Sequence, residues 1–273
     1  MERRERMELA FDHLVHFLRR PPVEAAERLQ KEGFHALAGG RHEAWGTCNS
    51  LSYFGLAYVE FLAVEYPEVA ERSDNPLVRQ LVQDAAVGEG MGQIALRTRD
   101  IERWAEHFHE RGMKVTGPLP GSRKREDGTV IRWQMLFAET PEERGRVPFL
   151  IQWEQSDDER RDDLTRRGVI APHPNGTHAL KCVCLAAEDA DEAAERWRRW
   201  FGLEAAEAFV DEGLNARCRT LAFSGGAVVL CQPLGEGLAR DALLARGERP
   251  FLVRFAGGSG EIRHELYGGW YVW

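Results

Sequence analysis

Hydrophobic and polar positions follow one plan in three separate stretches of the chain. Each stretch opens with an apolar run at strand spacing and continues with apolar residues at helical spacing, up to a glycine that precedes an apolar residue. A polar, ligand-capable side chain stands near the start of each run, and these three residues are His13, Gln93 and His178. A unit that recurs in this way predicts repeated structural modules around a concave small-molecule site.

The first repeat predicts the order strand, helix, strand, strand, strand. A strand over residues 9–18 ends at Pro21-Pro22, and proline is tolerated in the first turn of the helix that follows. Glycines then separate three strand candidates, which are Phe34–Ala38, Cys48–Phe54 and Ala57–Val64.

The second repeat predicts the same order after a helical connector over residues 75–87. Its first strand covers 92–98, and Asp100 is a good N-cap for a helix that extends to Arg111. A weak strand over 114–116, a polar loop from Gly117 to Gly128 and two clear strands complete it. The two clear strands are Thr129–Ala138 and Pro148–Glu154.

A highly charged segment, Gln155–Gly168, separates these repeats from the third. It predicts a solvated linker or a short surface helix. We therefore expect paired modules over 1–155, a linker over 156–175, and a third module with C-terminal strands over 176–273. Expected elements of the last part are a helix over 191–201, strands over 216–223 and 227–232, a helix over 237–245, and strands over 251–255 and 261–273. The terminal Trp270–Trp273 run fits a closing strand or the cover of a homodimer interface.

Composition narrows the classes of partner. The chain has 273 residues and a net charge of −8 with both signs interspersed, which argues against nucleic acid as the main partner. It offers neither an apolar stretch of membrane-spanning length nor an N-terminal signal pattern. We therefore expect a cytoplasmic protein with no membrane partner. Cys182 and Cys184 alternate on a strand, which predicts small core residues rather than a redox pair.

Two residues of the first repeat are candidates for chemistry. Glu60 is the only charge in the apolar run from Gly55 to Val64, and a carboxylate there needs a partner or a metal. His13 and His16 are three residues apart, so they face opposite sides of a strand and only one can serve a given site. The alternative for His13 is a hydrogen-bonded histidine of the core. The alternative for Glu60 is a buried ion-pair partner of Arg41.

The second repeat offers Gln93 in the place of His13 and Gln152 in the place of Glu60. If the two modules pack about a pseudo-twofold axis, these four side chains share one cavity. One imidazole, one carboxylate and two amide oxygens suit a divalent cation such as Zn, Mn, Fe(II), Co or Ni. Simple hydrogen-bonded polar residues are the alternative for both glutamines.

The layout resembles the vicinal oxygen chelate superfamily, which includes glyoxalase I, extradiol dioxygenases and bleomycin-resistance proteins. The first repeat is similar to the glyoxalase-like domain of uncharacterised bacterial proteins. The residues that carry this resemblance are Phe11–Val15, Gly39–His42, Trp45–Leu51, Tyr58–Phe61, Gly128–Trp133 and Pro148–Trp153. It implies an α+β fold in which βαβββ modules form curved mixed sheets around a metal held by the first and last strands of each module. His13 and Glu60 match those ligand positions.

Two functions follow from these residues. The first is a metal-dependent isomerase or lyase that acts on a small oxygenated molecule, with Glu60 as the general base. The second is a metal-free binding protein that sequesters an aromatic ligand, as the resistance proteins of the superfamily do. Residues expected to contact the ligand are Arg41, His42, Asn49, Trp133 and Trp153. The Arg123-Lys124-Arg125 segment fits either a clamp for an anionic substrate or an exposed charged hairpin.

Overall fold

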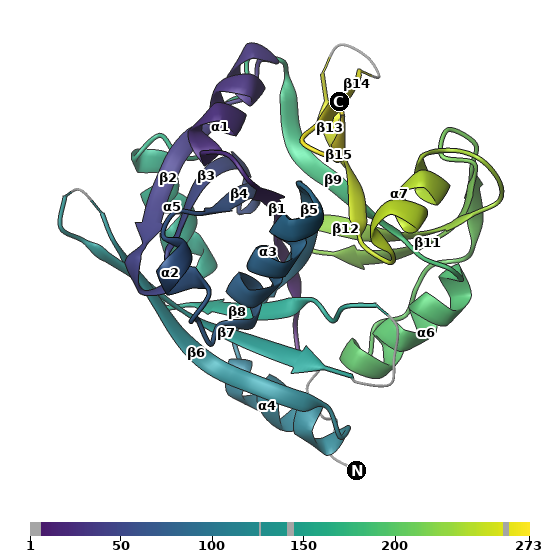
Figure 1. The fold of residues 1–273 in the computed structure, drawn as a ribbon, viewed down its shortest axis with the longest axis horizontal. Helices are drawn as coiled ribbons and strands as arrows, with labels where there is room; N and C mark the ends of the chain where they lie inside the picture. Colours follow the sequence, from purple (N-terminus) through teal and green to yellow (C-terminus); the bar gives the residue numbers. More distant parts are fainter. Residues whose placement is uncertain (1–6, 126, 141–144, 259–261) are drawn as a thin grey trace.

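The computed structural model describes residues 7–125, 127–140, 145–258 and 262–273. In this part of the chain two curved β-sheets are covered by helices (Figure 1). The first sheet has eight strands, in the spatial order β2 (Leu37–His42), β3 (Thr47–Phe54), β4 (Ala57–Val64), β1 (Ala10–Leu18), β5 (Gly90–Arg97), β8 (Phe149–Trp153), β7 (Val130–Glu139) and β6 (Lys114–Lys124). The sheet curls until its edge strands β2 and β6 approach one another.

Pairing in the first sheet shows how two modules become one surface. β1 pairs with β4 in parallel, so that His13 lies opposite Tyr58 and Val15 opposite Glu60. β5 pairs with β8 in parallel in the same way, and β1 and β5 join the two modules antiparallel at the centre. The α+β class and the βαβββ modules that the sequence predicts are confirmed.

Two helices of this half begin at a side-chain cap, and the sequence predicts one of these caps, Asp100. Asp100 accepts a hydrogen bond from the backbone N–H of Arg103, and Asn75 accepts one from the backbone N–H of Leu77. The helical elements are α1 (Pro22–Lys31), η1 (Glu43–Trp45), α2 (Pro67–Ala70), α3 (Pro76–Val87), α4 (Ile101–Glu110) and α5 (Asp157–Arg166).

The second sheet repeats the plan, but its last module has no helix. Its strands, in spatial order, are β10 (Phe209–Asp211), β11 (Ala216–Phe223), β12 (Gly226–Pro233), β9 (Thr177–Ala186), β13 (Pro250–Gly257), β15 (Gly269–Val272) and β14 (Arg263–Leu266). Its helices are α6 (Ala190–Phe201) and α7 (Leu238–Arg246). β15 closes the sheet between β13 and β14, and the expected start of this region at Glu261 lies outside the described residues.

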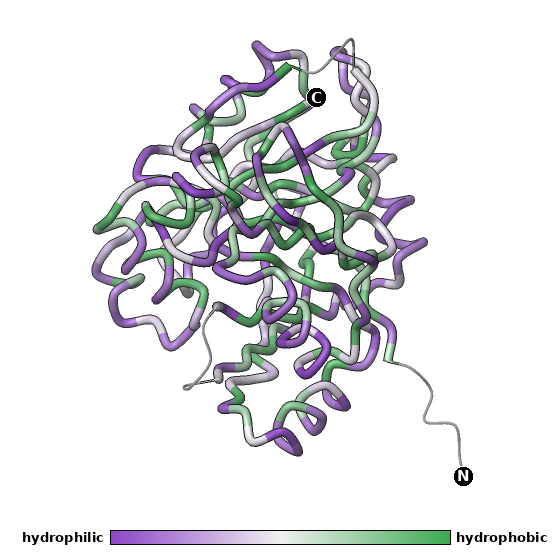
Figure 2. Tube along the Cα trace, turned by 90° about the vertical axis from the view of Figure 1, so that its right-hand side faces the viewer, coloured by the Kyte–Doolittle hydropathy of each residue, from purple (hydrophilic) through white to green (hydrophobic). Residues whose placement is uncertain are grey.

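One hydrophobic core joins the two sheets. Leu14 and Phe61 of the first sheet share it with Val253 and Tyr271 of the second. Apolar faces of α1, α4 and α6 complete it, among them the buried rings of Trp104 and Trp197. Hydrophobic segments run through the interior in Figure 2, while hydrophilic segments follow the outside. None of the described helices is both long and apolar enough to cross a membrane.

Two strands differ from the sequence-based expectation because β-bulges interrupt their alternation. β2 was expected over 34–38 but covers Leu37–His42, with a register shift between Ala38 and Arg41 around Gly39-Gly40. β6 covers Lys114–Lys124 and includes most of the expected polar loop, with a shift between Thr116 and Leu119. Glycine and proline at these points accommodate an extra residue and do not end the strand.

The charged segment forms the helix α5, one of the two expected alternatives. A capping box starts this helix, in which Ser156 and Glu159 exchange side-chain and backbone hydrogen bonds. The helix is not simply solvated, because its Arg160 side chain is buried in the first half of the molecule. This placement brings a charged residue of the segment to the concave face of the first sheet.

Candidate functional site

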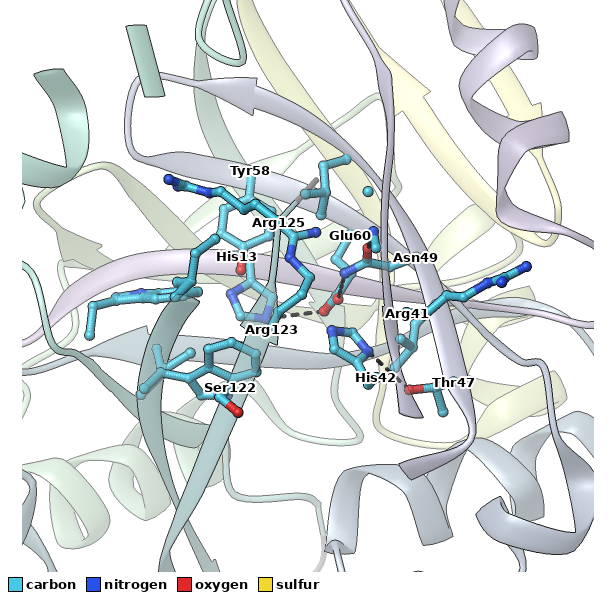
Figure 3. Close-up of a pocket in the computed structure, with 18 of the residues that line it drawn as sticks. His13, Arg41, His42, Thr47, Asn49, Tyr58, Glu60, Ser122, Arg123 and Arg125 are labelled. Atoms are coloured by element: carbon cyan, nitrogen blue, oxygen red, sulfur yellow. Dashed lines mark hydrogen bonds and ion pairs between the residues drawn. The ribbon is translucent and has the colours of Figure 1, made fainter. Parts of the chain in front are cut away.

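The concave face of the first sheet encloses a cavity of about 1010 Å³ (Figure 3). Side chains from β1, β3 and β4 form one wall, and side chains from β6, β7 and β8 form the other. α5 contributes Arg160 and Leu164 to the same lining. Both modules of the first sheet therefore contribute to a single concave site.

A chain of three ionisable side chains lies on one wall. His13 is 3% exposed, and its Nδ1 lies 2.7 Å from Oδ1 of Asp12. Its Nε2 lies 3.4 Å from Oε2 of Glu60, as the dashed line in Figure 3 marks. Because an ionised carboxylate only accepts hydrogen bonds, Asp12 fixes Nδ1 as a donor and aims Nε2 toward Glu60 and the cavity.

Three donors hold the other oxygen of Asp12. Nη1 of Arg97 lies 3.0 Å from Oδ2, Nη1 of Arg160 lies 3.2 Å from it, and Nε1 of Trp153 lies 3.1 Å from it. Asp12 is completely buried, so these bonds replace the water that its carboxylate gives up. The orientation of His13 therefore rests on contacts from β5, β8 and α5.

The pKa values of the three groups shift together. Burial alone would raise the pKa of Asp12, but Arg160, His13 and Arg97 outweigh it and hold that pKa well below its usual range. Burial would lower the pKa of His13, yet the contacts with Asp12 and Glu60 raise it. The pKa of Glu60 falls because its contacts with His13 outweigh its burial. The two carboxylates therefore favour the imidazolium form of His13.

Asn49 fixes the remaining oxygen of Glu60. Its Nδ2 donates to Oε1 of Glu60 at 2.6 Å, and its Oδ1 accepts from the backbone N–H of Gly40 at 2.8 Å. A Cβ atom at position 39 would collide with Oδ1 of Asn49, so Gly39 leaves room for this arrangement. The β2 bulge thus positions the carboxylate of Glu60 through one intermediate side chain.

The ring of His13 belongs to a stack of three aromatic rings that runs across neighbouring strands of the sheet. Tyr53, Tyr58 and His13 stand side by side on β3, β4 and β1. The ring centroids of His13 and Tyr58 are 4.4 Å apart, and those of Tyr58 and Tyr53 are 4.5 Å apart. These stacked rings make the wall rigid and aromatic.

All five residues expected to contact a ligand line the cavity. His42 bonds Thr47 through Nδ1 at 3.0 Å and meets the ring of Trp133 edge-on. Arg41 is 66% exposed and pairs with Glu65 at 2.8 Å, so it lies at the rim and is no partner of Glu60. The roles of these five residues in ligand binding stay predictions.

The structure does not bring the two predicted glutamine ligands to His13 and Glu60. Gln152 lies on the opposite face of β8, where its Oε1 accepts from the backbone N–H of Ile101 at 2.8 Å. Phe149 and Ile151 occupy the cavity side of that strand, because alternate residues face opposite ways. Gln152 is therefore one residue out of phase with the site.

Gln93 is displaced along the sheet rather than across it. Ala95, and not Gln93, lies opposite His13 in the pairing of β1 with β5. The amide of Gln93 donates to the carbonyl of Val147 and accepts from the backbone N–H of Ile94. It lines a separate pocket that it shares with Val147. Both ends of this side chain are thus engaged away from the main cavity.

These placements decide how well a divalent metal fits. Nε2 of His13 and Oε2 of Glu60 are the two donors that remain from the predicted set of four. Catalytic zinc sites take three protein ligands, and the described residues contain no group of three His, Cys, Asp or Glu side chains that could hold an ion. The donor set does not fit the four-ligand centre that the resemblance implies, and we derive no step through a metal.

Sequence reasoning missed several residues of the site. Asp12 directly precedes His13 in the first repeat. The sequence around Asp12 does not show that two arginines from distant segments donate hydrogen bonds to its carboxylate. Arg160 was assigned to a solvated segment, although its spacing of four residues from Leu164 places both on one side of α5. That spacing is the single local signal that pointed to Arg160.

Comparison with known proteins identifies the family and the fold. A family model described as a glyoxalase-like domain matches residues 11–201. A hypothetical protein from Staphylococcus aureus aligns over 97% of this chain and 98% of its own, with 20% identity and a TM-score of 0.74. A mutant 4-hydroxymandelate synthase from Streptomyces coelicolor aligns over 91% of this chain and 71% of its own, with 13% identity and a TM-score of 0.57.

At these identities the two solved structures establish the likeness of fold alone. No curated protein sequence matches the chain. The family model, in contrast, spans more than half of the chain and includes every residue of the wall that carries Asp12, His13 and Glu60. On this evidence the chain belongs to the glyoxalase-like domain family and has the vicinal oxygen chelate fold.

Proposed function

We propose that the protein is an enzyme of isomerase or lyase type that moves a proton on a small oxygenated molecule. The observation that carries this proposal is the buried series Asp12–His13–Glu60 at the wall of a large cavity. An acid and a base held side by side, each fixed by a further partner, is the arrangement that general acid–base catalysis needs.

The chemistry follows from the protonation states. Glu60, ionised, takes a proton from a carbon atom next to a substrate carbonyl, and the electron pair of that C–H bond moves toward the carbonyl oxygen. Nε2 of His13 donates a hydrogen bond or its proton to that oxygen, which stabilises the enolate or enol. Return of the proton to a neighbouring atom completes an isomerisation, and loss of a leaving group completes an elimination.

Substrate binding itself strengthens the base. In the free protein, His13 is the contact that most lowers the pKa of Glu60. When a substrate oxygen takes the proton of Nε2, that contact weakens and the basicity of Glu60 rises. Asn49 keeps the carboxylate in place during the exchange of partners.

Deuterium exchange tests this function without knowledge of the physiological substrate. A panel of 2-oxo acids and hydroxyketones in D₂O is monitored by proton NMR, with and without EDTA. We expect catalysed exchange at the carbon next to the carbonyl, retained in EDTA, and reduced about 10²- to 10⁴-fold in Glu60→Gln. Glu43→Gln, an exposed carboxylate at the rim, is the matched control and should keep full activity. Equal exchange in wild type and Glu60→Gln contradicts the proposal.

A second candidate function is sequestration of an aromatic ligand. Three tryptophans favour it, because the ring of Trp133 lies 6.1 Å from that of Trp45 and 5.5 Å from that of Trp153. Such a wall binds flat apolar groups without any chemistry. Tight binding of aromatic molecules that undergo no exchange, with affinity unaffected by Glu60→Gln, identifies this function instead.

A further inference from the structure

One terminal nitrogen of the Arg160 guanidinium makes no hydrogen bond at the wall of the cavity. The residue is 3% exposed, and its Nη1 donates to Asp12. Its Nη2 is buried and makes no hydrogen bond of normal distance and angle among the described residues, although the Tyr53 side chain lies close to the same guanidinium. An unpartnered cationic N–H in a buried site is costly, and a ligand that supplies the acceptor removes that cost.

Neighbouring groups hold this guanidinium in place. Its carbon Cζ lies 4.0 Å from the ring centroid of Trp153 and 5.9 Å from that of Tyr58. One turn along α5, Asp163 pairs at 2.7 Å with Arg125, the residue that follows β6, which fastens the helix to the first sheet. The arm is therefore positioned in advance, which is what specific recognition of an anion requires.

A second arginine enters the same cavity from β6. Arg123 lies against Gly40 of β2, and a Cβ atom at position 40 would collide with its side chain. The described residues show no carboxylate paired with Arg123, whereas Arg125 and Arg167 both have acidic partners. Gly40 thus admits an unpaired cation into the mouth of the cavity.

Charge in this region favours a ligand with one negative charge. Arg97 and Arg160 face Asp12 and Asp157, so two cations meet two anions. His13 and Glu60 form an ion pair that adds no net charge. Lys124 and Glu43 also line the cavity without an ion-pair partner among the described residues, and their charges offset each other. Arg123 therefore leaves one positive charge, which one carboxylate balances and a phosphate dianion exceeds.

We propose that the ligand of this cavity is a carboxylic acid whose carboxylate binds Nη2 of Arg160, with Arg123 closing over it. Arg160 and His13 both contact Asp12, so a carboxylate on Arg160 places its neighbouring carbon beside His13 and Glu60. The substrate class is therefore the 2-oxo and 2-hydroxy acids, with their side chains along the tryptophans. This assignment of the class rests on the proposed function, whereas the carboxylate site does not.

Three related probes separate charge from shape. Phenylacetate, phenylacetamide and phenyl phosphate share a ring and differ in the polar group, and calorimetry measures their binding to the full chain. We expect phenylacetate to bind at least about tenfold more tightly than the neutral amide and more tightly than the dianionic phosphate. Arg160→Lys keeps a cation beside Asp12 but lacks the second arm, and it should lose the preference for the acid.

Control variants keep the test decisive. Arg123→Gln should reduce phenylacetate affinity about three- to tenfold without any demand on folding, while Arg166→Gln, an exposed arginine of α5, should leave it unchanged. His13→Gln should lose deuterium exchange yet keep the preference for the acid, so failure of the catalytic proposal and of the carboxylate site are distinguishable. Equal affinity for acid and amide, strongest binding of phenyl phosphate, or no saturable binding of phenylacetate overturns the inference.

Discussion

In the first sheet the concave face surrounds an open cavity, whereas in the second sheet α7 packs against the corresponding surface. The two sheets share the same central arrangement, with one parallel and one antiparallel partner on either side of β1 or β9. The difference must therefore come from side chains and from what covers them.

The side chains of the two surfaces differ in kind. The first surface carries charged side chains that bind the carboxylate of Asp12, together with stacked aromatic rings. The second surface carries small thiols and alkyl groups. The buried, free thiols of the second surface are Cys182, Cys184, Cys218 and Cys231. Cys182 and Cys184 are core residues, as the sequence predicts. Leu238 and Leu243 of α7 pack against this cluster. One copy of the module thus lines the candidate site, and the other packs into a hydrophobic core.

Among the variants that compare the two surfaces, removal of the Asp12 carboxylate should produce the largest loss in the free energy of unfolding. Asp12→Ala leaves Arg97, Arg160 and His13 buried without their shared anion, so we expect a loss of about 3–5 kcal/mol in the free energy of unfolding. Urea denaturation followed by circular dichroism measures it. Asp158→Ala, at a carboxylate 91% exposed, should cost less than about 0.5 kcal/mol. A small loss for Asp12→Ala means that the charged wall does not depend on this residue.

Truncation of one leucine on each surface should sharpen the contrast. Leu252 is fully buried against the thiol cluster, and Leu252→Ala should cost about 2–5 kcal/mol because a new void opens. Leu62 already faces the cavity, so Leu62→Ala enlarges an existing space and should cost about half as much. Thermal unfolding of the two variants decides, and equal losses contradict a hollow first surface.

The pH dependence of stability near neutral pH should belong to the first surface. The second sheet also has a carboxylate, Asp211, whose pKa is lowered by Arg254, but its contribution is lost only in acid. The pKa of Asp12 and of Glu60 is lowered on folding, so their contribution is lost as the pH falls below about 4.5. The pKa of His13 is raised, so its contribution is present below pH 6.5 and is lost as the pH rises above that value. The stability difference between wild type and His13→Gln should therefore be largest between about pH 4.5 and 6.5.

The same measurement has an internal control in the second surface. Three of its thiols stay neutral over this range, because burial and their neighbours raise the pKa of Cys182, Cys184 and Cys231. The cost of Leu252→Ala should accordingly be independent of pH. A His13→Gln difference that stays constant from pH 4 to 9 would show that folding does not shift the pKa of His13.

The smallest effect is expected at the histidine of the third repeat. His178 is exposed on β9, and the last strand of its module offers no carboxylate. His178→Ala should change the free energy of unfolding by less than about 0.5 kcal/mol and leave exchange activity unchanged. A marked loss of activity in this variant assigns a second site to the third module.

The residues of the fold and of the site were not equally predictable. β4 and β11 match their expected bounds, because a short run of strand-forming residues that follows a glycine-containing turn is a local signal. Gln152 was assigned to the site because it resembles Glu60 in type and approximate position. A shift of one residue along a strand reverses the face, and that phase depends on how β8 pairs with β5.

The sequence alone determined the repeated modules and the cap at Asp100, because each depends on residues close together in the chain. Tertiary structure decided that Arg160 donates a hydrogen bond to Asp12, 148 positions away. It also decided that Gln93 binds the backbone carbonyl of Val147 and does not reach the main cavity. Whether a charged side chain is solvated or buried depends on which elements pack around it, and that information is not local.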